Sequence, residues 1–114
     1  MNLAEATDLA RSGKTVTVVH ETRVAGVQLL ERLPDGALDS AARINRTNGD
    51  QYVRFHGGGI LRFLNVHQVR VGYARGRSTD VVLVDAAVPL DGRLLLELGP
   101  LVAPDGAFAV APLS

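Results

Sequence analysis

The chain contains no cysteine and no tryptophan, and its single lysine is Lys14. The absence of cysteine excludes a disulfide framework, a thiolate nucleophile and a zinc site built on sulfur. Although 46% of the residues are hydrophobic, no uninterrupted apolar run approaches the ~20 residues that a membrane-spanning helix needs. The first residues lack the basic start and the apolar stretch of a signal peptide. We therefore expect a cytoplasmic protein without a membrane partner.

The charged residues are balanced in number but unevenly distributed. The 114 residues, which we expect to form a single domain over 1–114, include 12 basic and 12 acidic ones. Residues 43–77 hold seven arginines against one acid, a formal charge of +6, whereas residues 78–114 carry −4. Clustered arginines attract phosphate or carboxylate groups, so this segment predicts a surface for nucleic acid or an acidic protein. The alternative is that the arginines are scattered over a solvated sheet face. The candidate binding residues are Arg54, Arg62, Arg70, Arg75 and Arg77.

The hydrophobic periodicity predicts an α/β fold: a small, mainly parallel sheet flanked by helices, with a β-hairpin insertion at one edge. Helices are expected over 3–12, 21–33 and 90–98, and buried strands over 15–20, 81–85 and 107–111. Short β-like runs over 43–47, 51–56 and 60–64 are separated by Asn-Gly-Asp and Gly-Gly-Gly, which are hairpin signals. Residues 38–42 favour one helical turn, and 66–77 are expected to be irregular.

Two segments are similar to nucleotide-binding motifs. Ser12-Gly13-Lys14-Thr15 copies the end of a Walker A motif. Asp8, however, occupies the place of its first glycine, where a carboxylate would repel phosphate. The segment 81–87, VVLVDAA, has the Walker B pattern of an apolar strand that ends in a metal-binding aspartate. Here the aspartate is Asp85, and Ala86 follows it where the motif has a glutamate that orients water.

A longer stretch strengthens the second similarity. Residues 44–63 read INRTNGDQYVRFHGGGILRF and residues 73–87 read YARGRSTDVVLVDAA. This order of two turns, an Arg-Gly…Asp segment and an apolar strand resembles the ATPase core of phage terminase large subunits and related helicase-like motors. The resemblance implies a partial RecA-like core, encoded by a phage and located in the host cytoplasm. It places Asp85 at the metal-binding position as a Walker-B-like remnant. Because Ala86 replaces the glutamate and the Walker A motif is degenerate, we expect no ATPase activity, no catalytic residue and no cofactor.

Several functions remain open at this point. The leading hypothesis is a non-catalytic binding or assembly module that forms a homo-oligomer, since an uncovered parallel sheet edge needs a partner. The alternative is a nucleic-acid-binding protein that uses the arginines of 43–77, with aromatic residues nearby to stack bases. A third is an enzyme completed by a partner chain, and a small mixed β domain unrelated to ATPases is the rival fold. The spacing of the three histidines matches no metal motif, so no metal site is predicted.

Overall fold

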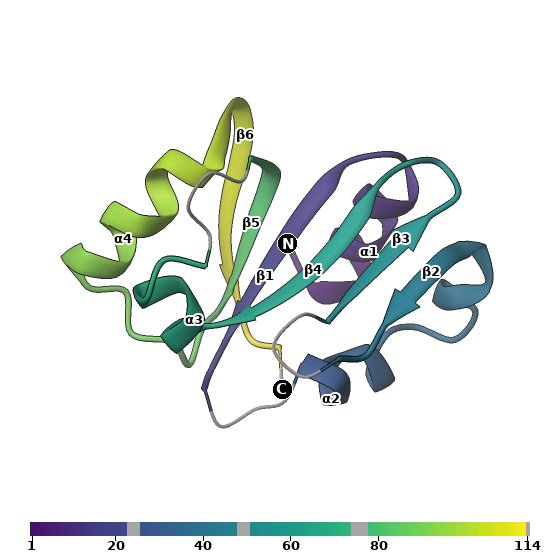
Figure 1. Ribbon diagram of the computed structural model, residues 1–114, viewed down its shortest axis with the longest axis horizontal. Coiled ribbons are helices and arrows are strands. Elements are labelled where there is room, and N and C mark those ends of the chain that lie inside the picture. The colour runs from purple at the N-terminus through teal and green to yellow at the C-terminus, as the bar shows by residue number, and fades with distance from the viewer. Residues whose placement is uncertain (23–25, 48–50, 74–77, 114) are drawn as a thin grey trace.

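The computed structural model describes residues 1–22, 26–47, 51–73 and 78–113, which form helices and strands that alternate except for three successive strands in the middle of the chain (Figure 1). The α-helices are α1 (Leu3–Arg11), α2 (Gly26–Glu31), α3 (Val66–Arg70) and α4 (Gly92–Leu98). The strands are β1 (Thr15–His20), β2 (Ala41–Asn45), β3 (Tyr52–Phe55), β4 (Ile60–Asn65), β5 (Thr79–Asp85) and β6 (Val102–Ala111). Two short 3-10 helices, Ala37–Ser40 and Gly99–Leu101, precede β2 and β6.

All six strands belong to one sheet in the order β2-β3-β4-β1-β5-β6. The strands β4, β1, β5 and β6 are parallel to one another, and β2 and β3 extend the sheet as an antiparallel hairpin that continues into β4. The prediction of an α/β fold with a mostly parallel sheet and hairpins at one edge is confirmed. The second hairpin strand, β4, is nevertheless an inner strand, because it pairs with β1 along its whole length.

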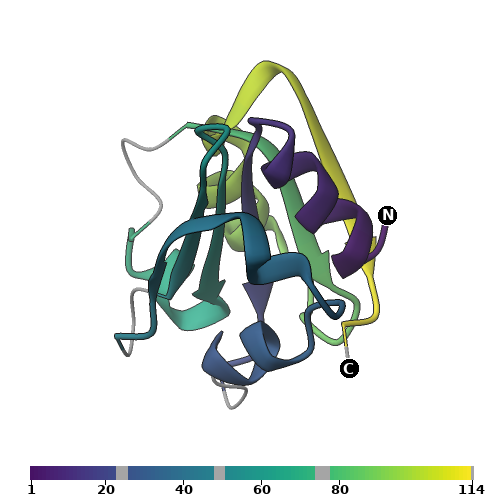
Figure 2. The ribbon, with the colours of Figure 1, turned by 90° about the vertical axis from the view of Figure 1, so that its right-hand side faces the viewer.

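The helices cover the two faces of the sheet and enclose two hydrophobic clusters. Helices α1 and α2 pack on one face, over buried side chains such as Val18, Phe63 and Leu83. Helices α3 and α4 pack on the other face, over Val19 and Val84 among others. Figure 2 shows α1 and α3 on opposite sides of the strands. Because successive strand residues point to opposite faces, β1, β4 and β5 contribute side chains to both clusters.

Several predicted boundaries were wrong. The segment 66–77, expected to be irregular, begins with α3, whose first turn is fixed by a capping box between Asn65 and Gln68. The helix expected over 21–33 is shorter, since α2 spans Gly26–Glu31 and neither Glu21 nor Thr22 is helical. The last strand is longer than expected, because β6 already begins at Val102.

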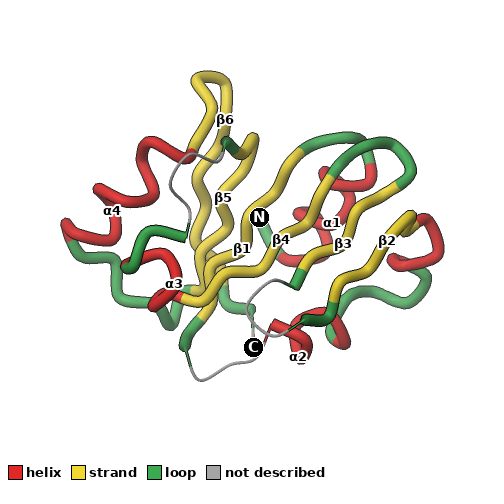
Figure 3. The backbone as a smooth tube through the Cα atoms, in the orientation of Figure 1, coloured by secondary structure: helices red, strands yellow, loops and turns green. Residues whose placement is uncertain are grey.

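The sheet has two open edges, formed by β2 and β6 (Figure 1). Helices α3 and α4 lie beside β5 and β1, away from β2 and β3 (Figure 3). Within the described ranges, no helix combines the length and apolar character that crossing a membrane requires.

Candidate functional site

Strand β3 separates its apolar and polar side chains onto opposite faces of the sheet. Val53 and Phe55 are buried in the cluster beneath α1 and α2. Because side chains alternate along a strand, Tyr52 and Arg54 lie on the opposite face, where Tyr52 is half-buried and Arg54 is exposed. This face of β3 is not covered by α3 or α4, which pack on the inner strands β1, β4 and β5.

Strand β4 adds a second arginine to the same face. Leu61 and Phe63 are buried on the α1 side, so Arg62 between them points the other way. Arg62 is directly opposite Tyr52 in the antiparallel register of β3 and β4. The guanidinium carbon of Arg62 lies 5.6 Å from the centroid of the Tyr52 ring, which is within the range of a cation–π interaction. The contact joins the side chains of β3 and β4 on this face.

Strand β2 completes the face with Arg43, which is exposed and is the cross-strand neighbour of Arg54. Like charges placed directly opposite each other in a sheet are destabilising. No ion pair or side-chain hydrogen bond from the described residues engages either of these two arginines, and no acidic residue occurs in β2, β3 or β4. We call this surface the arginine face; it consists of Arg43, Tyr52, Arg54 and Arg62.

The other arginines singled out in the sequence do not belong to this face as far as the structure describes them. Arg70 ends α3 and forms an ion pair of 2.8 Å with Asp91, the residue that caps α4. This contact ties two helices together and gives Arg70 a structural role. Arg75 and Arg77 lie outside the described residues. The sequence analysis left Arg43 out of the candidate site, although the alternation of polar and apolar residues in 43–45 and 52–55 is the signal that could have found it.

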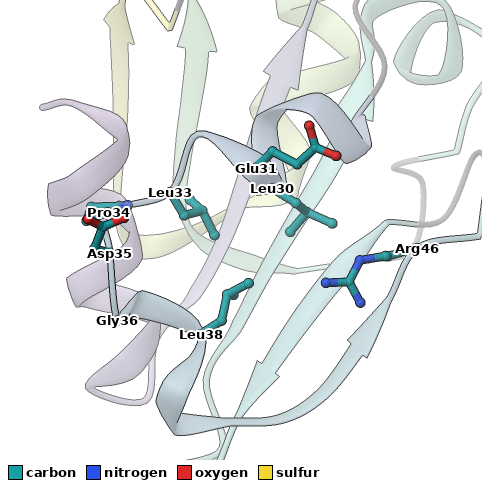
Figure 4. Close-up of a pocket in the computed structure, with 8 residues that line it drawn as sticks. All are labelled: Leu30, Glu31, Leu33, Pro34, Asp35, Gly36, Leu38 and Arg46. Carbon is teal, nitrogen blue, oxygen red and sulfur yellow. The ribbon is translucent and has the colours of Figure 1, made fainter.

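Arg46 lies on the opposite side of β2 and lines a pocket of about 260 Å³. Figure 4 shows its guanidinium pointing toward Leu30 and Leu38, with Leu33 further along the same wall. The pocket is smaller than the ~300–1,000 Å³ typical of ligand sites. We therefore assign it no ligand. The position of Arg46 shows that the described arginines of residues 43–77 are divided between the two faces of the sheet.

Asp85, the Walker-B-like remnant, ends β5 and is 4% exposed. Its Oδ1 accepts hydrogen bonds from the backbone N–H of Ala87 at 3.2 Å and of Leu113 at 3.4 Å. These bonds connect the turn after β5 to the segment that follows β6. At the other end of β5, Asp80 accepts a hydrogen bond from the N–H of Thr15 at 2.8 Å. The two carboxylates lie near opposite ends of β5, and each one accepts hydrogen bonds from the backbone.

The side chains of the described residues include no group of three or more histidine, aspartate or glutamate residues placed to hold a metal ion. His20 is buried, and its Nδ1 lies 2.9 Å from the backbone oxygen of Glu21. No protein-family model matches the chain, and no curated protein matches it either. We take the arginine face as the candidate binding site, because its exposed arginines are cross-strand neighbours and β2, β3 and β4 contain no acidic residue.

Proposed function

We propose that the chain is a non-catalytic binding module that holds the phosphate backbone of nucleic acid on its arginine face. The observation that carries the proposal is the cross-strand pair of Arg43 and Arg54. Two exposed guanidinium groups on neighbouring strands repel each other in the free protein. A phosphate between them would remove this repulsion and accept a hydrogen bond from each group, and guanidinium matches phosphate in geometry as well as in charge.

Tyr52 and Arg62 supply a second kind of contact. The aromatic ring lies on the same face as the exposed arginines and is already in contact with the guanidinium of Arg62. Base–aromatic stacking contributes ~1–3 kcal/mol per base and tolerates any sequence. With arginines on the backbone and one ring for a base, the face suits sequence-independent binding, and single strands are favoured because their bases are free to stack.

We also propose an evolutionary origin for the fold. A partial RecA-like core related to phage motor ATPases is supported by parallel strands around β1 and by Asp85 at the carboxyl end of β5. A non-catalytic role is supported by Ala86 after that aspartate and by the backbone hydrogen bonds that Asp85 accepts. In such a module the fold would be retained as a scaffold for binding.

Fluorescence anisotropy with labelled DNA of about 20 nucleotides, single- and double-stranded, tests the proposal at low and moderate salt. We expect micromolar binding that weakens steeply as salt rises, because phosphate contacts release counterions. The double variant Arg43→Ala, Arg54→Ala should bind more weakly, and the negative slope of log K against log salt should become shallower by about 2.

The control is Arg46→Ala, which removes one positive charge from the opposite face of the sheet, just after β2, and should leave the affinity and the slope nearly unchanged. An absence of binding at low salt would refute the proposal. So would an equal loss in the control, because that would show attraction to net charge rather than to the arginine face. A loss seen only on replacement of Arg75 and Arg77 would move the site to that segment.

A further inference from the structure

The two open edges of the sheet differ in how they are protected against pairing with another strand. Edge strands expose unpaired backbone groups, and natural proteins block them with charges and β-bulges. Strand β2 has both devices, since it carries the exposed Arg43 and its register with β3 shifts between Ala41 and Arg43. A second copy of β2 paired with the first would also bring arginines of both chains together.

The second half of β6 has neither device. Residues 106–114 include no charged side chain, and the register of residues 107–111 with β5 is continuous. Phe108 and Val110 remain 42% and 46% exposed at this edge. Their cross-strand neighbours on β5, Val82 and Val84, are fully buried. Phe108 and Val110 therefore lie on the same face of the sheet as the cluster beneath α4, at the open edge and in contact with water.

The backbone of β6 presents free hydrogen-bonding groups on its outer side. The N–H of Ala86 donates to the oxygen of Ala111 at 2.9 Å, so the carbonyl of Ala111 faces β5. In a parallel strand the backbone groups of successive residues point alternately to the two sides. The N–H and C=O of Phe108 and Val110 therefore point outward, where no strand of the described residues pairs with them.

We propose that β6 pairs antiparallel with β6 of a second copy of this chain, forming a two-fold symmetric dimer with one continuous sheet. A two-fold interface requires a surface that complements itself, and an uncharged segment meets no like charge when it faces its own copy. The pairing would bond the outward groups of Phe108 and Val110 and cover their side chains. It lies at the far edge from the arginine face, so it does not depend on nucleic-acid binding.

Sedimentation equilibrium over a range of concentrations tests the dimer. We expect the apparent mass to rise toward twice the chain mass of 12.1 kDa. Val110→Lys puts a charge at the interface, and Val110→Pro removes an outward N–H while leaving the bonds to β5 intact. Both variants should stay monomeric at concentrations where the parent chain is dimeric. Ala42→Lys adds the same charge on the exposed surface of β2 and should not change the association.

Hydrogen exchange separates strand pairing from other modes of association. The amide protons of Phe108 and Val110 should be protected at high concentration and exchange quickly at low concentration, whereas that of Ala109, which faces β5, should be protected at both. Circular dichroism confirms that each variant is folded; if Val110→Pro unfolds, Val110→Lys carries the test. A monomer throughout, association that survives these substitutions, or outward amides that exchange quickly in the dimer would each overturn the proposal.

Discussion

At the scale of single residues, the turn between β3 and β4 requires glycine for a steric reason. A Cβ atom on Gly59 would overlap the carbonyl oxygen of Ala10 in α1 and would lie 2.8 Å from that of Lys14. Both obstacles are backbone atoms and cannot rotate away. We expect Gly59→Ala to lower the free energy of unfolding by about 2–3 kcal/mol or more, measured by urea denaturation followed by circular dichroism.

Gly92→Ala is the matched control for this substitution. Gly92 is the first residue of α4, and a Cβ there meets no atom within 4 Å. Replacing glycine by alanine at a compatible helical position should leave stability unchanged or raise it by up to about 1 kcal/mol. If Gly59→Ala were equally harmless, the close packing of the β3–β4 turn against the end of α1 would be wrong.

The sequence predicts the structural role of a single residue only where that role depends on its neighbours in the chain. The Gly-Gly-Gly run indicates a hairpin turn by itself, and the turn is present between β3 and β4. The close approach of α1 to Gly59 is a tertiary contact, and no pattern in the sequence indicates it. The same limit explains Arg70, whose partner Asp91 is 21 residues away in the chain. The sequence analysis used charge density alone, and it therefore grouped Arg70 with arginines that lie on the sheet.

At the scale of elements, Asp91 has two separable roles at the start of α4. Its Oδ1 accepts a hydrogen bond from the N–H of Leu94 at 2.8 Å, and its Oδ2 accepts one from Arg70. Asp91→Ala removes both and should cost about 1 kcal/mol or slightly more, because the loss of an N-cap dominates. Asp91→Asn keeps the cap and loses the exposed ion pair, so it should cost less than about 0.5 kcal/mol.

Thermal and urea unfolding of the two variants, together with Arg70→Ala, measures this division. Arg70→Ala should resemble Asp91→Asn, since each removes the ion pair alone. If Asp91→Asn were as destabilising as Asp91→Ala, the ion pair rather than the cap would fix the start of α4.

Helix α3 shows where prediction of an element failed and why. Val66–Arg70 is too short for an apolar stripe to repeat, and the glycine that follows at position 72 favours irregular structure. The usable signal was Asn65 with Gln68 three residues later, the pattern of a capping box. The longer strands β1 and β5 were predicted close to their true bounds, because a continuous β-branched run has few alternative structures.

At the scale of the whole molecule, the alternation of helices and strands predicts a parallel sheet but does not fix the order of its strands. The position of β4 between β3 and β1 depends on side chains of β4 that suit both neighbours. Leu61 and Phe63 continue the cluster under α1, and Leu64 reaches the cluster under α3 and α4. Only tertiary packing selects this order, which also places the arginine face and β6 at opposite edges of the sheet.

The hydrophobic clusters on the two faces of the sheet share the strands β1, β4 and β5. We therefore predict that the two clusters unfold together. Leu98 of α4 is fully buried in one cluster, and Val53 of β3 is fully buried in the other. Leu98→Ala should lower the free energy of unfolding by ~2–5 kcal/mol. Because β1, β4 and β5 place alternate residues in both clusters, the protection of the Val53 amide should fall by the same free energy as the whole protein loses. Native-state hydrogen exchange measures this protection. If the Val53 amide kept its protection while the Val84 amide lost it, the α4 side would unfold separately as a less stable unit. The shared strands would then not make the two clusters unfold in one cooperative step.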